Sequence, residues 1–242
     1  MNKMIISGAV LALLAISFNG CGSTTSTNGE EAKAKIDFAE YFEKSDQVIN
    51  RVSIDSHTKE KTLNRDFYNV KVVVKDNIIT YEVKDKVQRK VTITNDEVNL
   101  TYPESPSDNI TRKRQIEIGE MLSYSSLERS FTTGGIKYES KKVKTCKLEA
   151  KINSFEIDPK LLDQKYAGDI IVEACTTTEE IFLGESNSTL TLVDTSRTYF
   201  QKGKGIITLV DDNCFIEKPI LYINDNSKEC AYRTSDVDAL VE

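Results

Sequence analysis

The sequence predicts an all-β protein: a curved antiparallel sheet, either an open half-barrel or a sandwich, with a short helix near the N-terminal end. Two observations predict this class. Apolar and polar side chains alternate over many short segments, which places the apolar ones on one face of a strand. Residues that favour turns separate these segments at short intervals, as they do in sandwiches and barrels.

Two hairpins carry the clearest alternation. Residues 67–75 place three valines on one face, and an Asp-Asn turn leads to the next strand at 79–83. A second Asn-Asp turn joins residues 90–94 to residues 97–102. Further strands are expected at 113–119, 125–133, 136–144, 146–154, 169–177, 188–200, 204–210, 214–217, 219–224 and 229–233.

Three segments depart from this alternation. Residues 37–44 carry apolar side chains at helical spacing, which predicts the short N-terminal helix. Residues 158–163 predict one helical turn, with Asp158 as its N-cap and a proline at the first helical position. The Pro/Ser-rich stretch 103–110 predicts a loop and an internal seam within a β-rich domain that spans 36–242.

Residues 1–20 have the composition of a secretory signal peptide, a positive start followed by an apolar run too short to span a bilayer. The segment 18–21, Phe-Asn-Gly-Cys, resembles the lipobox of bacterial lipoproteins. The resemblance implies that Cys21 becomes the lipidated N-terminal residue, and Gly22 after it implies delivery to the outer membrane. Residues 21–35, rich in Ser, Thr and Gly and then charged, predict a flexible tether. The alternatives are ordinary secretion after cleavage nearby and an uncleaved anchor.

The five cysteines divide into one and four. With Cys21 assigned to lipid, Cys146, Cys175, Cys214 and Cys230 form an even set in an exported chain, which predicts two disulfides. Three pairings are open, and the pairing of neighbours along the chain, 146 with 175 and 214 with 230, is slightly favoured. No Cys-x-x-Cys pair typical of zinc and redox sites is present, so no metal and no cofactor are predicted.

Charge and motif content exclude several classes of function. The net charge of −6 argues against a nucleic-acid partner. His57, the single histidine, lies among polar residues and is expected in a solvated loop, and no nucleophile motif accompanies it. The basic run 112–114 is expected to be a solvated guard on an edge strand. Asp-Asp-Asn at 211–213 is expected to form a hairpin turn, with weak calcium binding as the alternative.

These features predict a lipoprotein of the outer membrane that faces the periplasm or the cell surface and is not an enzyme. Its anchor predicts the membrane as one partner. The preferred function is an interaction or assembly module for another envelope protein, bound through a sheet edge or an apolar face. The alternative is a carrier for an apolar ligand such as a lipid or acyl chain, held within a curved sheet. A hydrolase is the third hypothesis, and only scattered acidic residues and the single histidine support it.

Overall fold

The computed structural model describes residues 35–57, 62–106, 109–133, 135–183, 188–219 and 232–241. Within them, twelve strands form one antiparallel sheet, and β1 (Ile36–Asp37) pairs with β8 (Gln115–Ile116) in a second, two-stranded sheet. In spatial order the large sheet contains β7 (Ile110–Lys113), β6 (Glu97–Thr101), β5 (Lys86–Ile93), β4 (Ile78–Val83), β3 (Thr62–Lys75), β2 (Gln47–His57), β14 (Tyr232–Val241), β13 (Gly205–Pro219), β12 (Ser188–Gln201), β11 (Lys165–Leu183), β10 (Ile136–Glu156) and β9 (Met121–Thr133).

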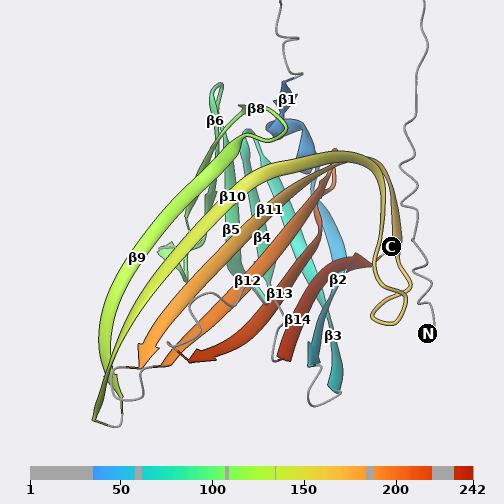
Figure 1. The fold of residues 1–242 in the computed structure, drawn as a ribbon. Coiled ribbons are helices and arrows are strands. Elements are labelled where there is room, and N and C mark those ends of the chain that lie inside the picture. Colours follow the sequence, from blue (N-terminus) through green and yellow to red (C-terminus); the bar gives the residue numbers. More distant parts are fainter. Residues whose placement is uncertain are drawn as a thin grey trace, which may run out of the picture. The chain divides into compact units, whose positions relative to one another are not determined.

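The two edges of the large sheet meet at one end. Arg112 of the edge strand β7 donates a hydrogen bond to the Leu122 carbonyl oxygen of the other edge strand, β9, at 3.2 Å. Its guanidinium also pairs with Glu173 of β11 at 2.7 Å. Figure 1 shows β9 and β10 sweeping away from β5 and β6 toward the opposite end, so the edges diverge there. The predicted class is therefore confirmed: the protein is all-β, and its antiparallel sheet is curved and nearly closed.

Several strands are longer than the sequence predicts. The segments expected at 136–144 and 146–154 form the single strand β10, and those at 204–210 and 214–217 form β13. The acidic stretch 211–213 thus continues a strand, and its prediction as a hairpin turn is wrong, because the ladder to β12 runs through it without interruption.

Two predictions for the N-terminal part of the chain, a helix over 37–44 and a loop around His57, are wrong. The helix predicted over 37–44 is a single 3₁₀ turn, Phe38–Tyr41, which Asp37 caps by accepting a hydrogen bond from the Ala39 amide. No α-helix forms within the described residues, since β-type backbone resumes at Phe42. His57 is the last residue of β2 and pairs in register with Thr62 of β3, so the loop expected around it is also wrong.

Two of the predicted turns are confirmed. The helical turn expected at 158–163 is present: the amides of Leu161 and Leu162 both donate to the Asp158 carbonyl oxygen, and the Asp158 side chain accepts from the Lys160 amide. The Asp-Asn turn after β3 places Asp76 at a φ of 55°. The stretch 103–110, where a seam was expected, contains the connection between β6 and β7, which pair with each other in one sheet.

Buried side chains form two cores on opposite faces of the sheet. The first joins Val72, Val91 and Leu100 to Leu148, Ile171 and Phe200. These two groups come from strands far apart in sheet order, so only the concave face can bring them together. The second core packs apolar side chains of β2, β13 and β14 against the connection between β10 and β11 (Val52, Ile54, Ile207, Val237 and Ala239 against Ile157, Leu161 and Leu162).

That connection is fastened to the convex face by polar contacts. Arg65 of β3 donates to the Leu161 carbonyl oxygen at 2.7 Å, and the Tyr166 hydroxyl donates to the Leu240 carbonyl oxygen of β14 at 2.5 Å. The part of the convex face formed by Val52 and Ile54 of β2 and by Val237 and Ala239 of β14 is therefore covered by the chain itself. In the part of the chain that the structure describes, no helix has the length and apolar content required to cross a bilayer.

Candidate functional site

A cavity of about 530 Å³ opens on the concave face of the sheet, beside the first core. Its apolar walls come from β2, β3, β4 and β13 (Ile49, Val70, Val83, Ile206 and Leu209). Its polar lining consists of two arginines, two acids, three tyrosines and one glutamine (Arg51, Arg89, Glu43, Asp238, Tyr68, Tyr81, Tyr102 and Gln88). The volume is typical of a small-molecule site, in which aliphatic side chains and aromatic rings form the walls and polar groups converge on the space between them.

The N-terminal segment determines where the cavity begins. Phe38 and Phe42 pack edge-to-face against Phe200, with ring centroids 5.1 and 5.9 Å away, and they fill the end of the concave face where the sheet edges meet. The segment reaches as far as Glu43, which lines the cavity, and Lys44 behind it is exposed. Among the described residues, the space beyond Glu43 forms the open cavity.

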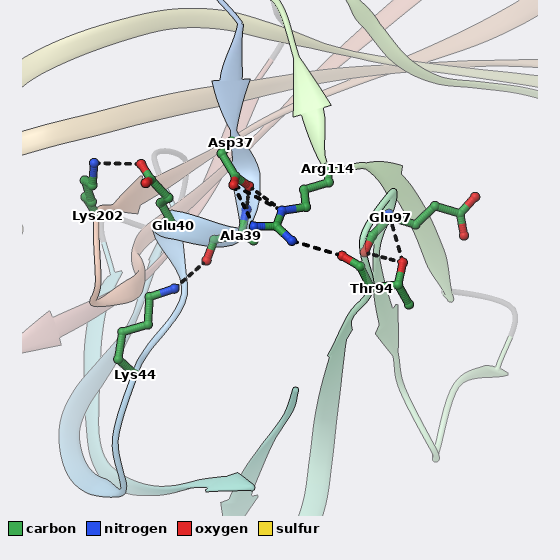
Figure 2. A network of polar contacts seen from close by, with 8 residues as sticks. All are labelled: Asp37, Ala39, Glu40, Lys44, Thr94, Glu97, Arg114 and Lys202. Carbon is green, nitrogen blue, oxygen red and sulfur yellow. Dashed lines mark hydrogen bonds and ion pairs between the residues drawn. The ribbon is translucent and has the colours of Figure 1, made fainter. Parts of the chain in front are cut away.

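Polar contacts hold this segment in place (Figure 2). Arg114 forms a bidentate pair with the Asp37 carboxylate, with Nε–Oδ1 and Nη2–Oδ2 distances of 2.9 and 2.8 Å. The same pair lowers the pKa of Asp37, chiefly through the hydrogen bonds from the guanidinium. Lys202 pairs with Glu40 at 2.6 Å, and the Lys44 ammonium donates to the Ala39 carbonyl oxygen at 3.0 Å.

Glu43 lies at the inner end of the cavity and is only 2% exposed. Its carboxylate accepts a hydrogen bond from the Tyr81 hydroxyl, and burial raises the pKa of Glu43 above its usual range despite that bond. The Glu43 carboxylate lies directly against Gly205, where an added Cβ would come within 2.5 Å of both carboxylate oxygens. Gly205 also has a φ of +71°, a conformation that side-chain-bearing residues rarely adopt.

On one side of the cavity, each of the three guanidinium nitrogens of Arg51 donates a hydrogen bond. Its Nε donates to Asp238 Oδ1 at 2.8 Å, Nη1 donates to the Ile206 carbonyl oxygen at 2.6 Å, and Nη2 donates to the Asp238 carbonyl oxygen at 3.3 Å. The Tyr68 hydroxyl completes the group by donating to Asp238 Oδ2 at 2.7 Å. Burial, together with that hydrogen bond, raises the pKa of Tyr68 to about 12, so the phenol stays protonated.

Arg89 on β5 differs from Arg51. Its guanidinium lies over the Tyr81 ring, 4.0 Å from the ring centroid, which is a cation–π contact. Its Nε is buried and has no hydrogen-bond partner among the described residues. Burial raises the pKa of Tyr81, so its hydroxyl stays a donor to Glu43 and does not become an anion for Arg89. The cavity thus contains a cation with an unused donor.

An acidic row continues the concave face past the cavity. Asp55, Asp236 and Asp211 are direct neighbours in register across β2, β14 and β13. Burial, with the charges of Asp194 and Asp236, raises the pKa of Asp211 to about 6. Burial and the charge of Asp55 also raise the pKa of Asp236.

The structure joins Cys146 and Cys175, directly opposite each other on β10 and β11, in a disulfide. With Glu173 they form a cluster of residue types that bind metals. Disulfide sulfurs are not thiolate ligands, however, and Glu173 is already paired with Arg112. Cys214 lies on β13, but its side chain, Cys230 and Cys21 fall outside the described residues.

The basic run 112–114 was predicted to be solvated, and this is wrong for Arg112. Arg112 is 5% exposed and points to the concave face, where Glu173 and the Leu122 carbonyl satisfy it. Lys113 does fit the prediction, since its side chain is 75% exposed beside Glu120.

None of the residues that line the cavity was predicted from the sequence as a site residue. The signal was present: Arg89 falls in the apolar phase of β5, between Val87 and Val91, and Arg51 falls in phase with Ile49 on β2. A charged residue in an inward-facing position indicates a polar feature inside the sheet. No protein-family model matches the chain, and neither a curated protein nor a solved structure matches it.

Proposed function

We propose that this chain is a non-enzymatic binding protein of the bacterial envelope that holds a small apolar ligand within its curved sheet. The cavity of about 530 Å³ carries this proposal, because the chain's own segments fill the concave face on one side of it and leave it open. Its walls are apolar on β2, β3, β4 and β13, which favours an aliphatic or aromatic ligand body.

Binding of a neutral fluorescent hydrophobe, N-phenyl-1-naphthylamine, tests this function. We expect saturable fluorescence enhancement with the full chain. Leu209→Trp should abolish the enhancement, because the indole fills the cavity beside Asp238. Leu63→Trp is the matched control, since Leu63 is exposed on β3 and does not line the cavity. Equal enhancement in both variants, or none in the wild type, would contradict the proposal.

We further propose that Cys21 carries lipid and anchors the domain to the outer membrane through the tether 21–35. The lipobox resemblance supports this, and two or more acyl chains give stable anchoring. Intact mass spectrometry of the wild-type protein from the membrane fraction tests this, and we expect a mature chain that begins at Cys21 and carries acyl groups. An N-terminus other than Cys21, or a mass without lipid, would rule the lipid anchor out.

The edge strand β9 favours interaction with another envelope protein as a second candidate function. Beyond its contact with Arg112 near Leu122, β9 pairs on one side only, with β10, within the described residues. Tyr124 and Leu127 on this strand are more than half exposed. An unpaired edge of this kind can accept an extended segment of a partner through main-chain hydrogen bonds.

A photocrosslinker at Tyr124 tests the interaction function in intact cells. We expect a specific adduct at native abundance from this position. Ile78 is the control position, because it is 42% exposed but lies on β4, where it pairs with Lys75 of β3 on one side and with Thr92 of β5 on the other. The same adducts from both positions, or none from Tyr124, would argue against a partner on the β9 edge.

A further inference from the structure

The two arginines of the cavity have different roles. Arg51 is neutralised by Asp238, and each of its three guanidinium nitrogens donates to a protein acceptor. Arg89 keeps a buried Nε–H without an acceptor among the described residues and rests on the Tyr81 ring. A buried donor without a partner is costly to a protein, and bound molecules often supply the missing acceptor.

Glu43 lines the same cavity as Arg89 but is not hydrogen-bonded to it in the described structure. Its carboxylate is directed toward the Tyr81 hydroxyl and Gly205. Burial shifts Glu43 toward its neutral form, whereas a guanidinium stays charged in any protein environment. The Arg51 guanidinium is thus paired with a carboxylate of the chain, and the Arg89 guanidinium is not hydrogen-bonded to one among the described residues.

We propose that the ligand is an amphipathic monocarboxylic acid whose carboxylate binds Arg89 while its apolar chain lies along Ile49, Val70 and Leu209. This inference rests on the proposed binding function and adds the class of head group. A carboxylate matches the edge of a guanidinium, where Nε and one Nη donate in parallel, and it supplies the acceptor that the buried Arg89 Nε–H lacks.

Other head groups fit less well. A neutral alcohol leaves the Arg89 charge without a counter-ion, and an amine adds a second positive charge beside it. A phosphate monoester carries up to two negative charges, and the second charge would face the Asp238 carboxylate across the cavity. The unused donor of Arg89 and the position of Asp238 therefore favour a monoanion over a neutral or doubly charged head group.

Displacement of N-phenyl-1-naphthylamine from the full chain by decanoate, decanol and decyl phosphate tests the inference. In the wild type we expect decanoate to bind more tightly than decanol by roughly tenfold or more. Arg89→Met should remove this preference and retain decanol binding, and Arg89→Lys should keep part of it. Lys90→Met is the matched control: it removes one positive charge from the next position of β5, which is exposed, and should leave the preference intact.

The possible failures are distinguishable. If the probe and all three ligands fail to bind, the proposed binding function itself is wrong. If decanoate and decanol bind equally well to the wild type, the cavity binds apolar ligands but the carboxylate inference is overturned, with no variant needed. Tighter binding of decyl phosphate than of decanoate would also overturn it, in favour of a phosphate head.

Discussion

The two sides of the cavity each contain an arginine, and the two arginines have different hydrogen-bond partners. On the β2 and β14 side, each guanidinium nitrogen of Arg51 donates to Asp238 or to the Ile206 carbonyl oxygen, and Tyr68 donates to the same Asp238 carboxylate. On the β5 side, Arg89 has an aromatic ring beneath it and an unused donor. From this difference we infer that Arg51 stabilises the fold and that Arg89 is available to bind a ligand.

Arg51→Met should have the largest effect on stability. Removing one partner of a buried ion pair leaves the other without compensation, and because Asp238 is partly solvated we expect a loss of about 3 kcal/mol in the free energy of unfolding. Urea denaturation measures this loss. Arg89→Met, the same change on the other side of the cavity, should cost less than about 1 kcal/mol because it breaks no hydrogen bond to Nε. Equal losses in the two variants would contradict the division of roles.

Gly205→Ala tests the inner end of the cavity, with a smaller expected effect. The new methyl group would meet the Glu43 carboxylate in a backbone conformation already unfavourable for alanine, so we expect a loss of about 2 kcal/mol in the free energy of unfolding. Gly203→Ala is the matched control, since its φ of +75° is similar but nothing lies within 4 Å of an added Cβ. Should the two variants lose the same stability, contact with Glu43 is not what requires glycine at 205.

Asp211→Asn concerns the acidic row and should stabilise the protein by about 1 kcal/mol at pH 7.5, after allowance for solvent screening. The folded pKa of Asp211 is raised to about 6, so the folded state binds a proton more tightly than the unfolded chain. Stability therefore falls as pH rises from about 4 to about 6, and the variant avoids that loss. Thermal denaturation at pH 4 and pH 7.5 checks this, with the exposed Asp66→Asn as control. A gain of equal size at both pH values would contradict the assignment.

Glu43→Gln should have the smallest effect, which is on the pH dependence of decanoate binding. The pKa of Glu43 is raised by burial, and as pH rises through it the new carboxylate competes with the ligand for the charge of Arg89. We expect wild-type affinity to weaken a few-fold with rising pH, on the order of one charge–charge interaction across the cavity. The affinity of Glu43→Gln should change less over the same range. Calorimetric titration at several pH values distinguishes the two curves, and parallel curves would argue against a role for Glu43.

The fold class could be predicted from the sequence because the alternation of apolar and polar side chains along a strand shows which residues lie on each face of the sheet. The hairpin from β3 to β4 shows this, with Val70, Val72, Ile79 and Tyr81 all buried as the pattern indicates. Strand ends were harder to predict. Asp211 reads as a turn residue, yet it lies within β13, because pairing with β12 and β14 outweighs the local preference of acidic residues for turns.

The cavity could not be predicted because its residues come from distant parts of the chain. Arg51 meets Asp238 only once β2 and β14 have paired, and Glu43 meets Tyr81 only once the segment before β2 has packed against the sheet. The sequence shows that Arg89 occupies an inward-facing position. It does not show whether another part of the chain supplies a carboxylate that pairs with the guanidinium. That distinction, which separates Arg51 from Arg89, depends on the tertiary structure alone.

The most direct test of the central claim is the ionisation of the bound ligand itself. Decanoate labelled with carbon-13 at its carboxyl carbon reports its own protonation through the carbon-13 chemical shift during a pH titration of the complex. If the carboxylate binds Arg89, the pKa of the bound ligand should fall well below that of free decanoate, and Arg89→Met should reverse the shift. A bound ligand that titrates in the same way in the wild type and in Arg89→Met would place the carboxylate elsewhere and contradict the account.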